Sequence, residues 1–475
     1  MTLPGRLLRL AASGITGLLL SACASLSAKD NDPLIGPKTD DFYALDGLHA
    51  EPENDEAIIV IAFSGGGKRS SAFGFGAMEA FQRVMIGGGA RARSLLSDAD
   101  VISGVSGGSF VAAGYGYQRA EFFTKFRKRF LEHDLEADIY GLFLLPWRWD
   151  WLFNAQWGRN DEMARVYGRL LFRDGDAHEA TYADLQRLGR PFIAIQATDL
   201  ATSDTFLFSQ TTFDLICSDL ATFPLARAVA ASNAFPGLFS PVTLINRRTE
   251  ACPVAVPHWI EEGLKAPPVS RLRFQAKTAH HYVNPDDGAY VHLVDGGVAD
   301  NLALRGLYDF VGRPDDARPL RVREAIARAR RIIFISVDGQ AVNDPEIGRV
   351  PVFDDFFRVL DAVTSGAIDR LNYETLLAGD ALLTEFAAAI NARRCAADPD
   401  AEGVQAYFAH VALKDASNAD DLKNIPTGLT IGSADIERLI EAGRNQADSN
   451  AEIGRFVREF GMRRNACEAA GSVTQ

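Results

Sequence analysis

The sequence predicts an α/β fold in which a mainly parallel central sheet carries helices on both faces. Short apolar runs typical of strands alternate with helix-like stretches from about residue 57 to residue 345. This alternation favours parallel strands joined by crossover helices. Two of the runs lead directly into glycine-rich turns. The hydrophobic content of 47% and the charged content of 23% are ordinary for a globular protein with a large core.

The individual elements are assigned from the apolar pattern and from the turns between them. Strands are expected at 57–63, 100–103, 192–198, 291–294 and 332–337, and helices at 70–86 and 107–130. The stretch 346–475 is helix-rich, with amphipathic segments from Phe353 to Ala367 and from Ala434 to Phe460 and a break at Pro426-Thr427-Gly428. We therefore expect a main domain over 55–345 and a C-terminal extension over 346–475 that packs on it.

Residues 1–22 have the layout of a secretory signal peptide. A short positive region precedes the run from Leu10 to Leu20, which is too short to span a bilayer. The tetrapeptide that ends in Cys23 resembles a bacterial lipobox, in which the cysteine is lipidated and becomes the new N-terminus. An ordinary signal peptide with a coincidental cysteine is the alternative. Ala24 resembles the sorting signal for the outer membrane, which predicts a lipid-anchored chain in the bacterial cell envelope that faces the periplasm.

Residues 23–54 are expected to form a tether, because they are rich in small and polar residues and show little periodicity. No later segment has 18 uninterrupted apolar residues, so the body of the chain is predicted to be tethered rather than membrane-spanning. The formal net charge of −13 argues against nucleic acid as a partner, because phosphate binding needs a basic surface.

The first glycine turn follows the run from Ile58 to Phe63 and reads Gly65-Gly66-Gly67-Lys68-Arg69. Glycines at this point can present backbone N–H groups to a developing oxyanion. A loop that cradles phosphate is the alternative. Neither G-x-G-x-x-G nor G-x-x-x-x-G-K-[ST] is present, so the pattern favours oxyanion stabilisation, provided that a nucleophile lies nearby.

The second glycine turn is a G-x-S-x-G motif centred on Ser106, placed where a strand turns into a helix. Gly104 and Gly108 form the tight nucleophile elbow of such a motif, and the serine hydroxyl is exposed at the helix N-terminus. The motif alone is a weak signal, because the chain contains 41 glycines. A serine that caps the helix is the alternative interpretation.

A third block begins with the apolar run from Val291 to Val294, which leads directly into Asp295-Gly296-Gly297. This places Asp295 at the C-terminal end of a strand and on the same edge of the sheet as Ser106. Active sites of α/β sheets collect at that edge. An Asx-turn that closes the strand is the alternative.

These blocks, in this order, resemble the patatin-like phospholipase family, whose pattern is G-G-G-x-[K/R]-G, then G-x-S-x-G, then D-G-[GA]. The segment from Ala231 to Pro241 is similar to the family's A-S-x-A-x-P-x-x-F-x-P block, and Asp300-Asn301 fits its D-G-G-x-x-D-N run. Ser70 departs from the glycine that the family usually has. The resemblance covers roughly residues 55 to 340 and implies a three-layer patatin-like catalytic domain.

The resemblance implies that Ser106 is the nucleophile and Asp295 its base, in a dyad without histidine that forms an acyl-enzyme. Gly65, Gly66 and Gly67 would donate N–H groups to the oxyanion. Arg69 would brace the loop or lend positive charge, with an ordinary surface arginine as the alternative. This chemistry requires no metal and no cofactor, and no acidic cluster resembles a calcium loop.

A standard α/β-hydrolase triad is the competing arrangement, and its residues follow the order Ser, Asp or Glu, then His. Only His410 follows Asp295, in an alternating strand-like run without the character of a catalytic loop. Ser64 rather than a histidine precedes the glycines, and His292 is expected to pack on a strand. The sequence therefore favours the dyad over the triad.

Four of the five tryptophans lie between Trp147 and Trp157. Such rings suit a membrane interface or the wall of an acyl-chain pocket, and a helix that packs onto the core is the alternative. Arg127, Lys128 and Arg129 are suited to anionic lipid headgroups, with a solvated helix face as the alternative.

Besides Cys23 the chain has four cysteines, which an exported protein can use for two disulfides. Pairing neighbours in sequence joins Cys217 to Cys252 and Cys395 to Cys467, and two other connectivities are equally allowed. Buried free thiols are the alternative. The cysteines lie too far apart in sequence for a zinc site.

The sequence therefore predicts a lipid-anchored serine acyl hydrolase that cleaves acyl esters of phospholipids or lysophospholipids. Its expected partners are these substrates and the membrane surface, reached through the lipid anchor and the Trp147–Trp157 segment. Two other functions stay open: a catalytically idle envelope protein that binds lipid, and a general carboxylesterase that acts on small esters.

Overall fold

The computed structural model describes residues 31–36, 42–45, 56–89, 92–144, 158–174, 178–311, 318, 320–340, 356–423, 425 and 427–471. The signal peptide, Cys23, most of the tether and the Trp147–Trp157 segment therefore lie outside the described residues. Within the described part of the chain, no helix combines the length and the apolar character needed to cross a membrane.

The main sheet has eight strands in the order β11-β12-β8-β5-β2-β13-β14, with β9 also paired to β8. Strands β8, β5, β2, β13 and β14 are parallel, whereas β9 and β12 pair antiparallel with β8, and β11 pairs antiparallel with β12. Their bounds are β2 Ala57–Phe63, β5 Val101–Val105, β8 Phe192–Asp199, β9 Asp204–Leu207, β11 Val242–Ile245, β12 Tyr290–Val294, β13 Arg331–Asp338 and β14 Gln405–Ala412.

Three small two-stranded sheets lie outside the main sheet in the described part of the chain. They pair β1 Asp32–Pro33 with β10 Ser218–Asp219, β3 Met85–Ile86 with β4 Arg93–Ser94, and β6 Arg173–Asp174 with β7 His178–Glu179.

The predicted α/β fold with a mainly parallel sheet is confirmed. Strands β5, β8 and β13 are buried along their whole length, and β2 is buried at every position except Ile58. Parallel strands covered on both faces need such continuous apolar runs, which is why the sequence reveals them. Each strand expected from the sequence is present, with ends within two residues of the expected bounds.

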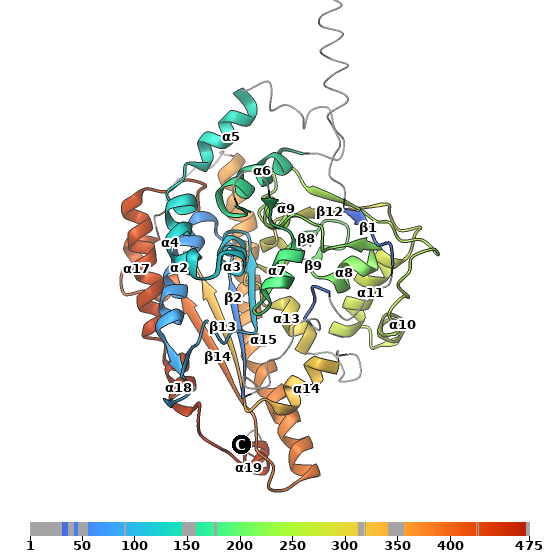
Figure 1. Ribbon diagram of the computed structural model, residues 1–475, viewed down its shortest axis with the longest axis vertical. Helices are drawn as coiled ribbons and strands as arrows, with labels where there is room; N and C mark the ends of the chain where they lie inside the picture. Colours follow the sequence, from blue (N-terminus) through green and yellow to red (C-terminus); the bar gives the residue numbers. More distant parts are fainter. Residues whose placement is uncertain are drawn as a thin grey trace, which may run out of the picture.

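Helices cover both faces of the sheet (Figure 1). On one face Phe63 of β2 packs against α2 Gly67–Arg83 and α3 Gly107–Gln118. On the opposite face Tyr308 of α13 Arg305–Val311 stacks on Phe334 of β13, with ring centroids 6.3 Å apart. Phe334 pairs with Val60, three residues from Phe63, so the two phenylalanines point to opposite faces.

The remaining helices are as follows: η3 Arg119–Glu121, α4 Phe122–Phe126, η4 Arg127–Leu131, α5 Leu135–Leu144, α6 Arg159–Leu171, α7 Tyr182–Leu188, α8 Gln210–Leu215, α9 Leu225–Ser232, α10 His258–Lys265, α11 Arg271–Val283, α12 Gly297–Asp300, α14 Leu320–Arg328, α15 Phe356–Ala397, η8 Leu413–Asp415, α16 Ala419–Leu422, α17 Ser433–Asp448, α18 Ala451–Glu459 and α19 Ala466–Gly471.

Two helices expected from the sequence are each divided in the structure. The stretch 107–130 is interrupted at Arg119, whose φ of 53° ends α3. The stretch 434–460 is divided at Asn450, whose side chain accepts hydrogen bonds from the backbone N–H groups of Glu452 and Ile453 and so begins a new helix. Helix α2 starts at Gly67, three residues before the expected start, because the turn at Gly66 already leads into the first helical turn.

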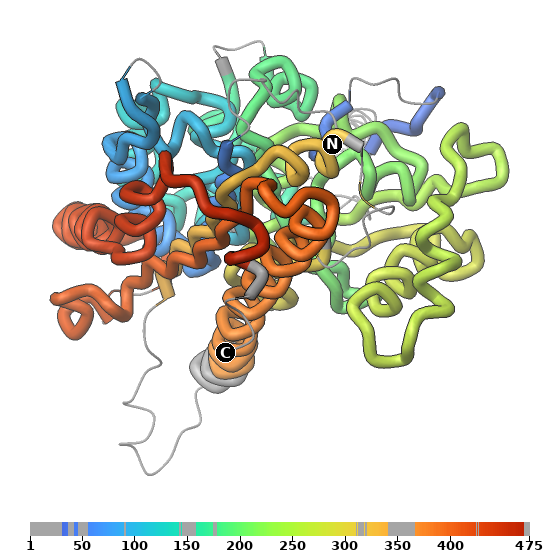
Figure 2. Tube along the Cα trace, turned by 90° about the horizontal axis from the view of Figure 1, so that it is seen from below, coloured from blue at the N-terminus to red at the C-terminus, as the bar shows by residue number. Residues whose placement is uncertain are grey.

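The C-terminal part of the chain contributes directly to the main sheet. Strand β14 pairs in parallel with β13 over eight residues, and α17 crosses α2 so closely that a Cβ on Gly443 would lie 1.9 Å from the carbonyl oxygen of Phe73. Viewed from below, α19 lies beside the C-terminal end of α15 (Figure 2), and a disulfide joins Cys395 to Cys467 there. A second disulfide joins Cys217 to Cys252, with Cα atoms 5.9 Å apart.

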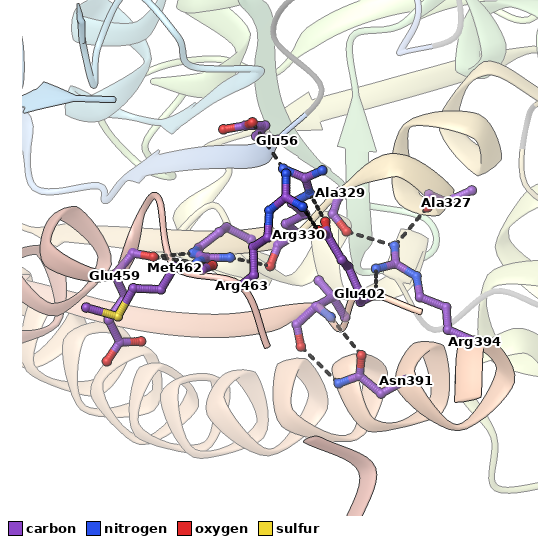
Figure 3. A network of polar contacts seen from close by, with 12 residues as sticks. Glu56, Ala327, Ala329, Arg330, Asn391, Arg394, Glu402, Glu459, Met462 and Arg463 are labelled. Atoms are coloured by element: carbon purple, nitrogen blue, oxygen red, sulfur yellow. Dashed lines mark hydrogen bonds and ion pairs between the residues drawn. The ribbon is translucent and has the colours of Figure 1, made fainter. Parts of the chain in front are cut away.

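A cluster of arginines connects the ends of these C-terminal elements to the start of β13 (Figure 3). Arg394 donates to the carbonyl oxygens of Ile326, Ala327 and Ala329 at the end of α14. Arg331 donates to the carbonyl oxygens of Glu459, the last residue of α18, and of Met462, three residues further on. Carbonyl groups at a helix C-terminus lack partners within the helix, so these guanidinium groups stabilise both helix ends.

Candidate active site

The two glycine turns meet at the C-terminal edge of the sheet. Strands β2 and β5 are parallel neighbours, so the turns that follow them leave from the same edge. A Cβ on Gly107 would lie 2.1 Å from the carbonyl oxygen of Gly67, and one on Gly108 would lie 2.3 Å from that of Phe63. Only glycine permits so close an approach of two backbones. The first turn is thereby held against the start of the helix that follows Ser106.

Ser106 occupies a strained turn between β5 and α3. Its φ of 49° and ψ of −124° are rare for a residue with a side chain, and its backbone N–H donates to Ser232 Oγ at 2.9 Å. Ser109 supports the same turn, since its hydroxyl donates to the carbonyl oxygen of Ser106 at 2.7 Å. Strain of this kind is typical of a nucleophile elbow.

Asp295 lies directly beside this serine. Ser106 Oγ donates to Asp295 Oδ2 at 2.8 Å, and the backbone N–H of Gly297 donates to Asp295 Oδ1 at 2.8 Å. The carbonyl oxygen of Asp295 accepts from Thr198 Oγ1 at 2.9 Å, which holds the backbone beside β8. The carboxylate is therefore fixed with one oxygen toward the hydroxyl.

Asp295 follows an antiparallel strand, whereas Ser106 follows a parallel one. Strand β12 runs antiparallel to β8 and overlaps it only at Leu293 and Val294, which pair with Asp199 and Thr198. The strand thus enters the sheet from the C-terminal edge of β8 and ends there. Its C-terminal end meets the C-terminal ends of β5 and β8 for this reason.

Burial governs the protonation of this carboxyl group. Asp295 is only 7% exposed. Desolvation raises the pKa of Asp295 to about 6, against hydrogen bonds from Gly297 and Ser106 that lower it. A carboxylate with such a pKa is mostly ionised at neutral pH yet more basic than an exposed aspartate, which suits it to accept a proton from a hydroxyl group.

The three glycines of the first turn are not equivalent. The backbone N–H of Gly65 donates to the carbonyl oxygen of Asn301 at 2.9 Å, so the expectation that Gly65 offers a free donor is wrong. Glycine is needed there for space, because a Cβ would lie 2.3 Å from Asn301 Oδ1 and 3.3 Å from Ser106 Cβ. Among the described residues, the N–H groups of Gly66 and Gly67 meet no acceptor.

Arg69 connects the first glycine turn to two other segments of the chain. Its Nε donates to the carbonyl oxygen of Gly339 at 3.2 Å, and its Nη1 donates to that of Ile425 at 3.0 Å. Ser70, where the family usually has glycine, lies in the first turn of α2, and its hydroxyl donates to the carbonyl oxygen of Ser64 at 2.7 Å. The alternative of an ordinary surface arginine does not apply, since Arg69 is 7% exposed.

The comparison with family models matches residues 61–308 to the patatin-like phospholipases. The match spans more than half of the 475 residues. The chain belongs to the patatin-like phospholipase family. Lipid acyl hydrolysis in general is the activity that this membership supports.

The fold is also similar to solved structures of human GIVD cytosolic phospholipase A2. One has a TM-score of 0.44 at 11% identity and covers 89% of this chain and 64% of that chain. The other, in complex with methyl γ-linolenyl fluorophosphonate, has a TM-score of 0.42 at 13% identity and covers 89% and 61%. This chain thus spans less than two thirds of the length of those proteins. The comparison with curated proteins finds no match.

The histidines that a triad would need lie elsewhere in this patatin-like protein. His410 is on β14, separated from β5 by two strands, with its Nε2 3.6 Å from Asp338 Oδ2. His292 is on β12 and contacts Thr243 Oγ1 at 3.0 Å. In the described part of the chain, no histidine hydrogen-bonds to Ser106 or Asp295. Nor do these residues include a group of three or more His, Cys, Asp or Glu side chains that could hold a metal ion.

Two neighbours of the site were not assigned a role from the sequence. Ser232 and Asn233 end helix α9, where Ser232 Oγ accepts from the N–H of Ser106, and Asn233 Oδ1 lies 3.4 Å from Ser106 Oγ. Both fall in the Ala231–Pro241 block, so the resemblance to the family contained a signal for them. Ser232 and Asn233 lie 126 and 127 positions after Ser106 in the sequence, so their contacts with Ser106 depend on tertiary packing.

Arg127, Lys128 and Arg129 lie on η4, whose last residue, Leu131, accepts through its carbonyl oxygen from Lys68 Nζ of the first glycine turn at 3.2 Å. Arg127 pairs with Glu132 at 2.9 Å and with Glu437 at 2.6 Å, so acidic side chains neutralise its charge. Lys128 and Arg129 are exposed.

Proposed function

We propose that the protein is a serine acyl hydrolase that cleaves fatty-acyl esters of phospholipids or lysophospholipids with Ser106 as nucleophile and Asp295 as base. The observation that carries the proposal is the 2.8 Å hydrogen bond from Ser106 Oγ to a buried carboxylate whose pKa is raised to about 6. A base of this kind can accept the serine proton without a histidine.

The positions of these groups support the following reaction. Asp295 takes the hydroxyl proton while Ser106 Oγ attacks the ester carbonyl, and the proton then passes to the departing alcohol oxygen. The carbonyl oxygen carries negative charge meanwhile, and the N–H groups of Gly66 and Gly67 are suited to stabilise it. Loss of one such donor typically costs about 3 kcal/mol of transition-state stabilisation. Water then hydrolyses the acyl-enzyme through the same base.

The test is hydrolysis of short-chain and long-chain acyl esters and of phospholipid vesicles by the wild type, Ser106→Ala and Asp295→Asn. We expect both variants to lose activity on lipid. Activity on small esters alone would favour a general carboxylesterase, and a wild type inactive on every ester would favour a lipid-binding protein. Activity that survives Ser106→Ala would refute the nucleophile.

The proposed location is the periplasmic face of the bacterial outer membrane, with Cys23 as the lipidated anchor and the Trp147–Trp157 segment at the membrane surface. The lipobox-like tetrapeptide and the four clustered tryptophans support this location. Cys23→Ser should move the protein from the membrane fraction to the soluble fraction. Retention of the variant in the membrane fraction would contradict the anchor.

A further inference from the structure

Asn233 presents a fixed hydrogen-bond acceptor to the nucleophile. Its Nδ2 donates to the carbonyl oxygen of Val229 at 2.8 Å and to Ser109 Oγ at 2.9 Å. The carbonyl oxygen cannot donate, and the Ser109 proton is already given to the carbonyl oxygen of Ser106. The amide nitrogen must therefore occupy this side. Asn233 Oδ1 is held toward Ser106 Oγ, 3.4 Å away.

Among the described residues, the Ser106 hydroxyl is the one donor within hydrogen-bond distance of Asn233 Oδ1. Ser106 has a single hydroxyl proton, and the shorter contact directs that proton to Asp295 Oδ2 at 2.8 Å rather than to Asn233 Oδ1 at 3.4 Å. Asn233 is 8% exposed, so solvent reaches little of its side chain. A buried carbonyl oxygen aimed at the reacting atom without a donor requires an explanation.

The acyl-enzyme intermediate explains the position of this carbonyl oxygen. Once Ser106 Oγ is an ester oxygen it has no proton, and both Asp295 Oδ2 and Asn233 Oδ1 face it as acceptors. A water molecule has two protons for these two acceptors. With both hydrogen bonds made, a lone pair of its oxygen is left free to attack the acyl carbon.

We propose that Asn233 is a catalytic residue of deacylation that orients the hydrolytic water together with Asp295. The inference rests on the proposed function. As the water oxygen bonds to the acyl carbon, one water proton passes to Asp295 and the other stays bonded to the water oxygen and donated to Asn233. The carbon–Oγ bond then breaks, Asp295 returns its proton to Ser106 Oγ, and the fatty acid leaves.

The acylation step does not require Asn233 to orient a water molecule. In that step the attacking atom is Ser106 Oγ itself, and its one proton goes to Asp295. The two half-reactions should therefore respond differently to loss of the amide. This difference separates a role in water orientation from a general role in holding the site together.

The test uses Asn233→Leu, which keeps a side chain of similar size but removes the acceptor, with a p-nitrophenyl fatty-acyl ester as substrate. We expect kcat to fall about 10- to 100-fold, as for loss of a buried hydrogen bond, and kcat/KM to stay within about threefold of the wild type. Nitrophenol should appear as a burst equal to the enzyme concentration. Intact-protein mass spectrometry should show the acyl group on the variant, and labelling of Ser106 by a fluorophosphonate should proceed at the wild-type rate.

Ser232→Ala is the matched control, because Ser232 Oγ accepts from the backbone N–H of Ser106 and makes no hydrogen bond to Ser106 Oγ, the atom that carries the acyl group. We expect it to slow labelling and turnover together, without a burst. If Asn233→Leu does not fold, Asn233→Ala removes the same acceptor and answers the same question.

An equal fall in kcat and kcat/KM for the Asn233 variant, with no acyl-enzyme, would overturn the inference and leave the proposed function intact. A wild type inactive on every ester would overturn both.

Discussion

Burial of the Asp295 carboxylate should make the protein less stable than it would be with a neutral side chain at that position. Asp295→Asn keeps the shape of the side chain, and its carbonyl oxygen can still accept from Gly297 N–H. Its amide nitrogen can donate to Ser106 Oγ in place of the bond that the wild type makes in the other direction. We therefore expect Asp295→Asn to abolish activity and to raise the free energy of unfolding at neutral pH.

The size of the effect follows from the pKa. The pKa of Asp295 is raised from 3.8 to about 6, so the folded state binds more protons than the unfolded state between these values and stability falls as pH rises through them. Linkage then gives a free-energy cost of the charged form of about 3 kcal/mol at pH 7.5, which falls to roughly half of that at pH 5 and to below about 1 kcal/mol at pH 4. The stability gained by the variant should shrink with acidification in the same way.

The assay is urea denaturation of the wild type and Asp295→Asn at several pH values, followed by tryptophan fluorescence. Asp300→Asn is the comparison, because burial raises the pKa of Asp300 to about 6 as well, and its carboxylate does not contact Ser106. It should gain stability with the same pH dependence while retaining activity. A stability gain that is independent of pH, or a variant less stable than the wild type at pH 7.5, would refute the reasoning.

Three further predictions concern the site and the stability of the fold. In a pH profile of kcat/KM, the acid limb should have an apparent pKa of about 6 and should persist in Asp300→Asn. An apparent pKa of about 4 would contradict a desolvated base. Gly107→Ala should lower kcat at least about 100-fold, because its Cβ would lie 2.1 Å from the carbonyl oxygen of the first glycine turn. Gly461→Ala, whose Cβ would meet nothing within 4 Å, should leave kcat unchanged. Replacement of Cys395 and Cys467 by serine should lower the free energy of unfolding by about 4 kcal/mol in urea, since the disulfide closes a loop of 72 residues.

The sequence was sufficient to predict the strand and the helix that flank Ser106, the proposed nucleophile. The strand before the first glycine turn is a continuous apolar run, and the strand before Ser106 is short and fully buried. The glycines that follow both strands permit a tight turn into a helix. Local pattern of this kind identifies buried parallel strands and their turns. It correctly placed Ser106 and Asp295 on one edge of the sheet.

The remaining features depend on contacts that no local pattern encodes. An apolar run does not reveal its direction, so the antiparallel course of β12 was not foreseen. The partner of the Gly65 N–H is a backbone carbonyl more than 200 residues away, at Asn301. The amide of Asn233 bonds to Val229, four residues earlier on the same helix, but its second partner, Ser109, is within reach only after α9 packs against α3. These are tertiary effects, and they determine which groups at the site are free to act.

The support of the first glycine turn comes largely from residues outside the 61–308 region that matches the family. Arg69 reaches Gly339 and Ile425 with two different nitrogens of one guanidinium group. The backbone N–H of Lys68 donates to the carbonyl oxygen of Gly428 at 3.2 Å. Residues after the family-matched region therefore hold the loop that contains the Gly66 and Gly67 donors.

This arrangement distinguishes the two roles that the sequence left open for Arg69. If Arg69 only lends positive charge, Arg69→Lys should keep most of the activity, because the charge remains. If it braces the loop, one amine cannot replace a planar fork that bonds to two carbonyl oxygens on separate segments. We expect the brace, and therefore a fall in kcat of about tenfold for Arg69→Lys with little change in KM, as for loss of one to two hydrogen bonds. Steady-state kinetics on one acyl ester measure this directly. An unchanged kcat would mean that charge alone matters and that the contacts to Gly339 and Ile425 are dispensable.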